Sequence, residues 1–166
     1  MDEKKLTCCF SGHRPNKLPW RQNEQDTRCI ALKAELAARL EGIYQAGYRH
    51  FICGMALGCD MYFADAVIAL RNIHSDVTLE AAIPCGTQSE RWSVQHRIRY
   101  NNLLDSCDKV TVLQIEYTPE CMQQRNEYMV DRSSLLLCCF NGTSGGTMKT
   151  ILYAIRTGAD TIVIDV

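Results

Sequence analysis

The stretch SSLLLCCFNGTSGGT, residues 133–147, decides the fold of this chain. Its first part, 133–140, is apolar almost throughout, which is typical of a strand that a parallel sheet buries on both faces. A glycine-rich turn follows at 141–146, and residues 147–157 are expected to form a helix. A buried strand that leads through a glycine turn into a helix is the repeating unit of α/β proteins.

The same order of strand and helix recurs along the chain on both sides of this stretch. We expect strands at 6–11, 48–53, 76–83, 109–115, 133–140 and 161–166, and helices at 23–46, 60–72, 90–106, 119–131 and 147–157. The unbroken alternation predicts one α/β domain over residues 1–166, with a mainly parallel sheet between helices on both faces, a three-layer sandwich.

Composition excludes several classes of protein. The 166 residues carry a formal net charge of −1, which argues against a general polyanion-binding surface. The apolar run Leu6–Phe10 is too short for a secretion signal, and no apolar run approaches the ~20 residues of a membrane helix. We therefore expect a cytoplasmic protein that does not enter a membrane.

Ten cysteines are the unusual feature of the composition. They could form disulfides, bind a metal, or serve as small core residues. Structural disulfides are rare in the cytosol, and no two cysteines have the Cys-x-x-Cys spacing. Cys8-Cys9 and Cys138-Cys139 are neighbours on expected strands, so each pair points to opposite faces and cannot hold one ion. We expect buried, unbonded cysteines and no metal site.

The loop after the first expected strand reads Ser-Gly-His-Arg-Pro at 11–15. Ligands of parallel α/β sheets bind outside the carboxyl ends of the strands, where this loop lies. Gly12 permits a close approach of the backbone, and Arg14 is a planar donor suited to phosphate or carboxylate. The alternative is a surface turn with an exposed arginine.

The loops after the second and fifth expected strands also lead into helices. Gly54 and Gly58 precede a helix start, where free N–H groups favour an anion. Asp60 would repel a phosphate there; it either caps the helix or accepts a hydrogen bond from a ribose hydroxyl. The turn at 141–147 has three glycines and is a stronger candidate phosphate cradle, with a plain flexible turn as the alternative.

Two further clusters accompany these loops. Gln88 and Trp92 follow the third expected strand and could flank a planar ring, although Trp92 is equally suited to anchor the core. Arg125 and Asn126 lie on the helix before the fifth strand, where an ordinary polar helix face is the alternative.

Together these segments resemble the SLOG superfamily, the Rossmann-like group that contains the DNA-processing protein DprA (Smf) and the LOG nucleotide hydrolases. Residues 53–60, Cys-Gly-Met-Ala-Leu-Gly-Cys-Asp, are similar to the S-G-x-A-x-G-I-D motif of DprA. Arg125-Asn126, the apolar strand and the Gly145-Gly146 turn are similar to its R-N, strand and S-G order. Segment 11–15 is similar to the first turn of the superfamily, and with Gln88 and Trp92 the YpsA-like branch is the nearest match.

The resemblance implies a Rossmann-like fold that binds a nucleotide or nucleotide-derived ligand, such as an ADP-ribose-like molecule or a nucleoside monophosphate. The expected ligand-binding residues are Gly12, His13, Arg14, Gly54, Gly58, Asp60, Gln88, Trp92, Arg125, Asn126, Gly145, Gly146 and Thr147. No other cofactor is expected, and the oligomeric state is open, with a homo-oligomer among the alternatives.

Two other functions stay open. LOG enzymes split the N-glycosidic bond of nucleoside monophosphates with a P-G-G-x-G-T-x-x-E loop. Alignment on Gly146-Thr147 places Thr150 where the glutamate should be, so the acid/base group is missing. Asp60, Glu80 and Glu90 are candidates to replace it, and no catalytic residue is assigned.

The second alternative is single-stranded DNA binding, which the similarity to DprA implies. Arg91, His96, Arg97 and Arg99 form a local basic stretch that could contact phosphates. The slightly acidic chain as a whole disfavours a nucleic acid partner.

Overall fold

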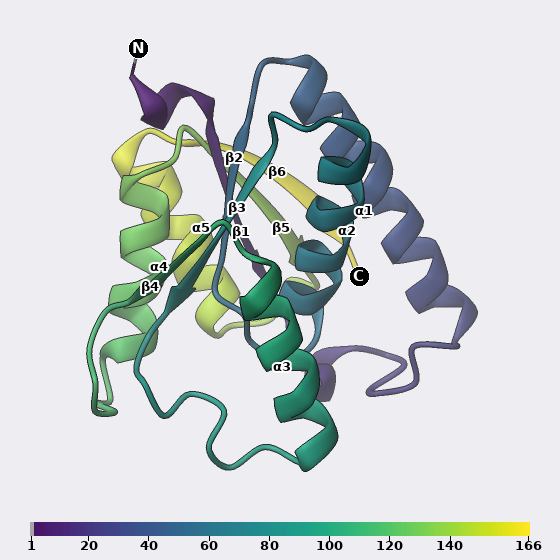
Figure 1. Ribbon diagram of the computed structural model, residues 1–166, viewed down its shortest axis with the longest axis vertical. Helices are drawn as coiled ribbons and strands as arrows, with labels where there is room; N and C mark the ends of the chain where they lie inside the picture. Colours follow the sequence, from purple (N-terminus) through teal and green to yellow (C-terminus); the bar gives the residue numbers. More distant parts are fainter. Residues whose placement is uncertain (1) are drawn as a thin grey trace.

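The computed structural model describes residues 2–166, which form a six-stranded sheet in the order β4-β3-β2-β1-β5-β6 (Figure 1). The strands are β1 Thr7–Gly12, β2 His50–Cys53, β3 Thr78–Ile83, β4 Lys109–Val112, β5 Leu135–Phe140 and β6 Asp160–Asp165. All neighbouring strands run parallel, so every connection must cross over the sheet through a helical segment. The expected parallel α/β architecture is confirmed.

Helices cover both faces of this sheet. They are α1 Thr27–Gln45, α2 Cys59–Ile73, α3 Val94–Ser106, α4 Cys121–Asp131 and α5 Gly146–Thr157, and short 3-10 helices occupy Glu3–Leu6 and Pro15–Lys17. The first three α-helices lie on one face and α4 and α5 on the other, as Figure 1 shows. The fold is the expected Rossmann-like three-layer sandwich. Within residues 2–166, no helix combines the length and apolarity needed to cross a bilayer.

Capping residues move two helix starts away from their expected positions. The helix expected from residue 23 begins at Thr27, because the side chain of Asp26 accepts a hydrogen bond from the backbone N–H of Arg28. The helix expected from residue 90 begins at Val94, since the Ser93 hydroxyl accepts from the N–H of His96. The expected strand 109–115 ends at Val112, although the N–H of Leu113 still donates to the carbonyl oxygen of Ile83 at 2.9 Å.

The cysteines fill the core on both sides of the sheet. Cys8 and Cys139 belong to the larger apolar cluster under α1–α3, whereas their neighbours Cys9 and Cys138 belong to the smaller cluster under α4 and α5. All ten cysteines are unbonded, and all but Cys107 are buried. The prediction of small buried core residues is therefore confirmed, as is the alternation of each pair across the sheet.

The topology places a crevice between β1 and β5. After β1 the chain continues to β2 on one side, and after β5 it continues to β6 on the other. The loops that leave these adjacent strands therefore diverge at the carboxyl edge of the sheet. Such a topological switch point is where open α/β sheets bind their ligands.

Candidate functional site

A cavity of about 230 Å³ lies at this switch point, and we call it the switch-point cavity. It is lined by Phe10, Ser11, Gly12, His13, Arg14, Asn16, Lys17, Ala56, Asp60, Met122, Arg125, Asn126, Met129, Gly146 and Thr147. The end of β1 and the loop after it, the loop after β2, the first turn of α2, one face of α4 and the start of α5 contribute these residues.

Most residues expected at a ligand site meet at this cavity. The structure brings together Gly12, His13, Arg14, Asp60, Arg125, Asn126, Gly146 and Thr147. Gly54, Gly58 and Gly145 lie outside its lining, and Gln88 and Trp92 line a second cavity. Lys17, Asn16 and Met122 were missed, because an isolated lysine, asparagine or methionine in a loop or helix carries no sequence signal.

Arg125 is the central charged group of the switch-point cavity. Its side chain is only 4% exposed, yet it lines the cavity. Nη1 donates to the carbonyl oxygens of Gly54 at 2.6 Å and Ala82 at 3.3 Å, and Nε donates to Oδ1 of Asn126 at 2.9 Å. Nη2 contacts the sulfur of Met122 at 3.9 Å.

No carboxylate neutralises this guanidinium directly. Among residues 2–166, no carboxylate oxygen lies within 4.0 Å of its nitrogens. Burial lowers the pKa of Arg125, and the more distant charge of Asp60 acts in the opposite direction. Because arginine stays protonated in proteins, the cavity wall carries a buried positive charge whose contacts are carbonyls, an amide and a thioether.

The packing of Arg125 requires a glycine at residue 54. A Cβ at residue 54 would lie 2.3 Å from Nη1 and 2.4 Å from Cζ of Arg125. Gly54 lies outside the cavity lining and packs against the side chain of Arg125, which itself lines the cavity. The glycine lets α4 place its arginine against the loop after β2.

Gly58 and Gly145 also serve the packing of loops. Gly58 has φ of 93°, and a Cβ there would lie 2.7 Å from the carbonyl oxygen of His13. Gly145 has φ of 146°, and a Cβ there would lie 2.6 Å from Nζ of Lys17. Both positions are in the region that favours glycine, so other residues would be strained.

Asp60 adds a buried carboxyl group to the same cavity. The N-cap of α2 is Gly58, so the interpretation of Asp60 as N-cap is wrong. Its Oδ2 instead accepts from the N–H of Ala56 at 3.0 Å and so orders the loop after β2. Burial raises the pKa of Asp60, and the positive charge of Arg125, the Ala56 N–H and the charge of Arg14 oppose this shift.

His13 joins the two diverging loops. Its Nε2 accepts from the backbone N–H of Asn141 at 3.1 Å, which places the proton of the neutral ring on Nδ1. Burial, followed by the charge of Lys17, lowers the pKa of His13, so the ring is neutral near pH 7. His13 therefore positions the loop after β5 relative to the loop after β1.

The start of α5 presents backbone donors to the cavity. Its N-cap is Gly145, which has no side chain to accept hydrogen bonds from the first helical N–H groups. Gly146 and Thr147 line the cavity at this end. Nζ of Lys17 donates to the carbonyl oxygen of Ser144 at 2.6 Å and places a further positive charge beside the turn. This arrangement favours an anion.

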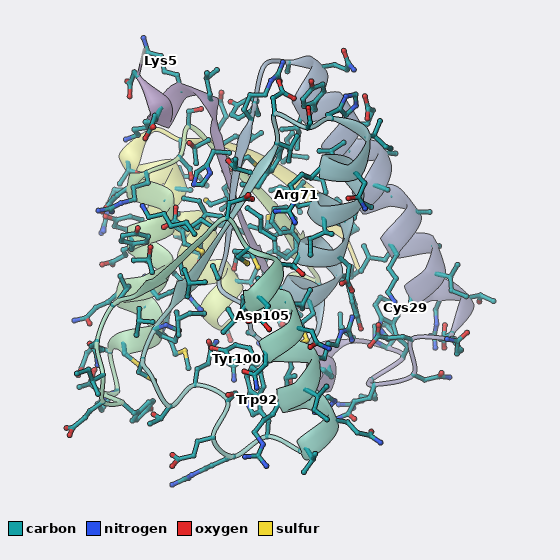
Figure 2. The ribbon with its side chains drawn as sticks, in the orientation of Figure 1. Lys5, Cys29, Arg71, Trp92, Tyr100 and Asp105 are labelled. Atoms are coloured by element: carbon teal, nitrogen blue, oxygen red, sulfur yellow. The ribbon has the colours of Figure 1, made fainter. Side chains whose placement is uncertain are left out.

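A second cavity, of about 420 Å³, adjoins the first, and we call it the aromatic cavity. It is lined by Cys85, Thr87, Gln88, Glu90, Arg91, Trp92, Tyr117 and Met122, so Met122 borders both cavities. Figure 2 shows Trp92 beside Tyr100 of α3; their rings are 5.2 Å apart and nearly perpendicular, at 83°. Trp92 packs against the core through Tyr100 and also lines the cavity.

Thr150 and two of the acidic residues considered as a replacement acid/base group, Glu80 and Asp60, differ in their positions relative to the switch-point cavity. The hydroxyl of Thr150 donates to the carbonyl oxygen of Gly146 at 2.9 Å, inside the first turn of α5. Glu80 is buried and accepts from the hydroxyls of Thr111 and Tyr128 at 2.8 and 2.7 Å. Glu80 does not line the switch-point cavity, whereas Asp60 does.

Two of the four members of the expected basic stretch are exposed, and one of the other two is neutralised by acidic residues. Arg99 pairs with Glu24 at 2.6 Å and with Asp65 at 2.9 Å. Arg91 and Arg97 are exposed. The stretch therefore offers less free positive charge than its sequence indicates.

Comparisons with known proteins agree with this fold. The family model YpsA, described as the YspA SLOG family, matches residues 8–163. An uncharacterised SPbeta prophage-derived protein of Bacillus subtilis, YoqJ, is 28% identical over 141 residues, which cover 77% of this chain and 82% of YoqJ.

Solved structures of the DNA-processing protein DprA share the fold. The protein from Helicobacter pylori, whose structure is described as revealing a single-stranded DNA binding mode, aligns with a TM-score of 0.60 at 17% identity. The Streptococcus pneumoniae protein aligns with a TM-score of 0.62 at 15% identity. Each alignment covers 97% of this chain but 66% and 50% of the two DprA chains, respectively. Given the family match over residues 8–163, the chain belongs to the YspA SLOG family.

Proposed function

We propose that this protein binds a phosphate-bearing nucleotide or nucleotide-derived ligand in the switch-point cavity. The observation that carries the proposal is the convergence of two arginines on an uncharged atom. Nη2 of Arg14 and Nη2 of Arg125 each lie 3.9 Å from the sulfur of Met122. A thioether accepts hydrogen bonds weakly and cannot offset two positive charges.

An anion bound between the two arginines would offset the free-energy cost of burying the Arg125 charge, which no carboxylate of residues 2–166 pairs with directly. Burying a charge without an opposite charge is unfavourable, and Arg125 is almost fully buried. A phosphate is a suitable partner, because arginine binds its oxygens through paired, charge-assisted hydrogen bonds. The open N–H groups at the start of α5 line the same cavity and would add further donors.

Asp60 supports a ligand that carries a sugar as well as a phosphate. A carboxyl group in a cavity that attracts anions would repel inorganic phosphate if both were charged. A carboxylate oxygen accepts readily from a sugar hydroxyl. Among residues 2–166, only Oδ2 of Asp60 accepts a hydrogen bond from the protein, which leaves Oδ1 for such a hydroxyl. A ribose phosphate unit satisfies both the arginines and this carboxyl group.

Calorimetric titration with AMP, ADP-ribose, ribose 5-phosphate and inorganic phosphate tests the proposal. Arg14→Met removes an exposed charge that converges on Met122, and Arg39→Met removes an exposed charge from α1 as a matched control. We expect Arg14→Met to weaken nucleotide binding about tenfold, the scale of one charged hydrogen bond, and Arg39→Met to leave it unchanged. If no compound binds the folded protein, or both variants weaken binding equally, the proposal is wrong.

Single-stranded DNA is the second candidate ligand. The DprA structure from Helicobacter pylori is described as binding it, and exposed Arg91 lines the aromatic cavity. Binding through phosphates would weaken steeply with salt. A gel shift with a single-stranded oligonucleotide at two salt concentrations tests this candidate, and the absence of any shift at low salt would remove it.

A further inference from the structure

We propose that the aromatic cavity is the subsite for the planar heterocyclic base of the ligand whose phosphate occupies the switch-point cavity. This inference rests on the proposed function and specifies the ligand as an intact nucleotide rather than a sugar phosphate. Its starting point is that Met122 lines both cavities. One ligand can therefore extend from one cavity to the other across a single side chain.

The walls of the two cavities are joined by a continuous series of hydrogen bonds. The hydroxyl of Tyr100 donates to Oε1 of Gln88 at 3.2 Å, and Nε2 of Gln88 donates to the carbonyl oxygen of Gly54 at 3.0 Å. That same carbonyl accepts from Nη1 of Arg125 at 2.6 Å. Gln88 is thus a connecting residue, and the packing partner of Trp92 is tied to the arginine that would hold the phosphate.

The aromatic side chains favour a flat, polarisable group. The ring of Trp92 is held nearly perpendicular to Tyr100 and is half-buried, so its orientation is set before any ligand arrives. Tyr117, from the loop after β4, also lines the cavity and is 62% exposed. An exposed aromatic ring beside a fixed one suits stacking on a base.

The remaining lining favours a heterocycle over a purely apolar group. Thr87, Glu90 and Arg91 place a hydroxyl, a carboxylate and a guanidinium at the same cavity. Such groups offer hydrogen-bonding partners to the ring nitrogens and amino groups of a base, whereas a hydrocarbon would leave them without partners.

The two tryptophans of the chain allow a direct optical test. Trp20 is 6% exposed and donates from Nε1 to the hydroxyl of Tyr62 in the core. In Trp20→Phe, Trp92 is therefore the remaining fluorophore, and in Trp92→Phe the buried Trp20 is. We expect saturable quenching by AMP in Trp20→Phe, no change with ribose 5-phosphate, and no response of Trp92→Phe to either compound.

A second measurement keeps the inference testable if Trp20→Phe does not fold. In calorimetry, Tyr117→Ala should weaken AMP binding about tenfold, within the range for loss of one base–aromatic stack. Its affinity for ribose 5-phosphate should stay within twofold of the unchanged chain. Tyr153→Ala, on α5 and outside both cavity linings, is the matched control and should alter neither affinity.

The outcomes separate this inference from the proposed function. If AMP binds by calorimetry but Trp92 does not respond, or if Tyr117→Ala weakens AMP and ribose 5-phosphate equally, the base lies elsewhere and the inference is overturned. If neither AMP nor ribose 5-phosphate binds the folded protein, the proposed function is overturned as well.

Discussion

Replacing Gly54 by alanine tests whether the buried arginine organises the site. The added methyl carbon would lie 2.3 Å from Nη1, 2.4 Å from Cζ and 2.9 Å from Nε of Arg125. The backbone of Gly54 is not in the left-handed region, so alanine itself causes no strain there. The cost must therefore come from displacing the guanidinium.

The structure sets the expected size of that cost. A displaced Arg125 loses its hydrogen bonds to the carbonyl oxygens of Gly54 and Ala82 and to the side chain of Asn126. A hydrogen bond to a charged group contributes about 1.5–3 kcal/mol, and part of this is recovered if the guanidinium reaches water. We expect Gly54→Ala to lower the free energy of unfolding by about 3 kcal/mol and to weaken nucleotide binding.

Unfolding in guanidinium chloride, followed by circular dichroism at pH 7, measures this change. Gly42→Ala is the matched control: it lies within α1, and a Cβ there would meet no described atom within 4 Å apart from its chain neighbours and the adjacent backbone of its own helix. Alanine is the better helix former, so Gly42→Ala should raise the free energy of unfolding by about 0.5–1 kcal/mol.

A double-mutant cycle identifies the cause. In an Arg125→Ala background the clash is gone, so Gly54→Ala should cost less than about 1 kcal/mol. A full cost in that background would show that the methyl group acts on something other than Arg125. A stability of Gly54→Ala within 0.5 kcal/mol of the unchanged chain would contradict the packing argument altogether.

Three other properties follow from the structure. Burial alone would raise the pKa of Glu80, but hydrogen bonds, led by the one from His50, hold this pKa at about 2, below the ordinary 4.5. The lowered pKa stabilises the fold by about 3 kcal/mol above pH 4.5, and this stabilisation is lost as the pH falls toward 2. Urea unfolding between pH 7 and 3 should therefore show a flatter pH dependence for Glu80→Gln than for the unchanged chain, and equal slopes would refute this. Thiol titration with a disulfide reagent at pH 8 should be slow in the native protein and reach all ten cysteines in denaturant, because nine of them are buried and burial raises the pKa of the tenth, Cys107, to about 12. Rapid native labelling would show that the core opens. Incubation with nucleoside monophosphates should release no free base by chromatography, because Thr150 stands where a LOG enzyme has its glutamate; a released base would point to Asp60 as the acid/base group.

Much of the fold could be predicted from local patterns. A strand that is apolar throughout, such as Leu135–Phe140, is informative by itself because burial on both faces leaves no polar positions. The adjacent cysteine pairs were assigned to opposite faces for the same reason, since side chains alternate along any strand. Helix starts were less predictable, because Asp26 and Ser93 act as caps through hydrogen bonds that periodicity does not reveal.

The candidate site could be predicted in part. The loops at Gly12, Asp60 and Gly146 were expected to meet because the carboxyl ends of parallel strands share one edge of the sheet. Gly54 and Gly58 were expected to touch the ligand for the same reason. In the structure these glycines make room for Arg125 and for the backbone of His13. A glycine in a motif indicates a close approach, but it does not identify the group that approaches.

The sequence by itself determined the order of strands and helices, the parallel sheet and the edge where a ligand would bind, because these depend on periodicity and glycine placement within short segments. The tertiary structure decided which distant groups meet. Arg125 reaches the carbonyl of Gly54 across 71 residues, and His13 accepts from Asn141 across 128. Met122 lines both cavities, and a single methionine in the sequence gives no indication of such a position. Such contacts arise from how the helices pack on the sheet, and that packing is a property of the whole chain.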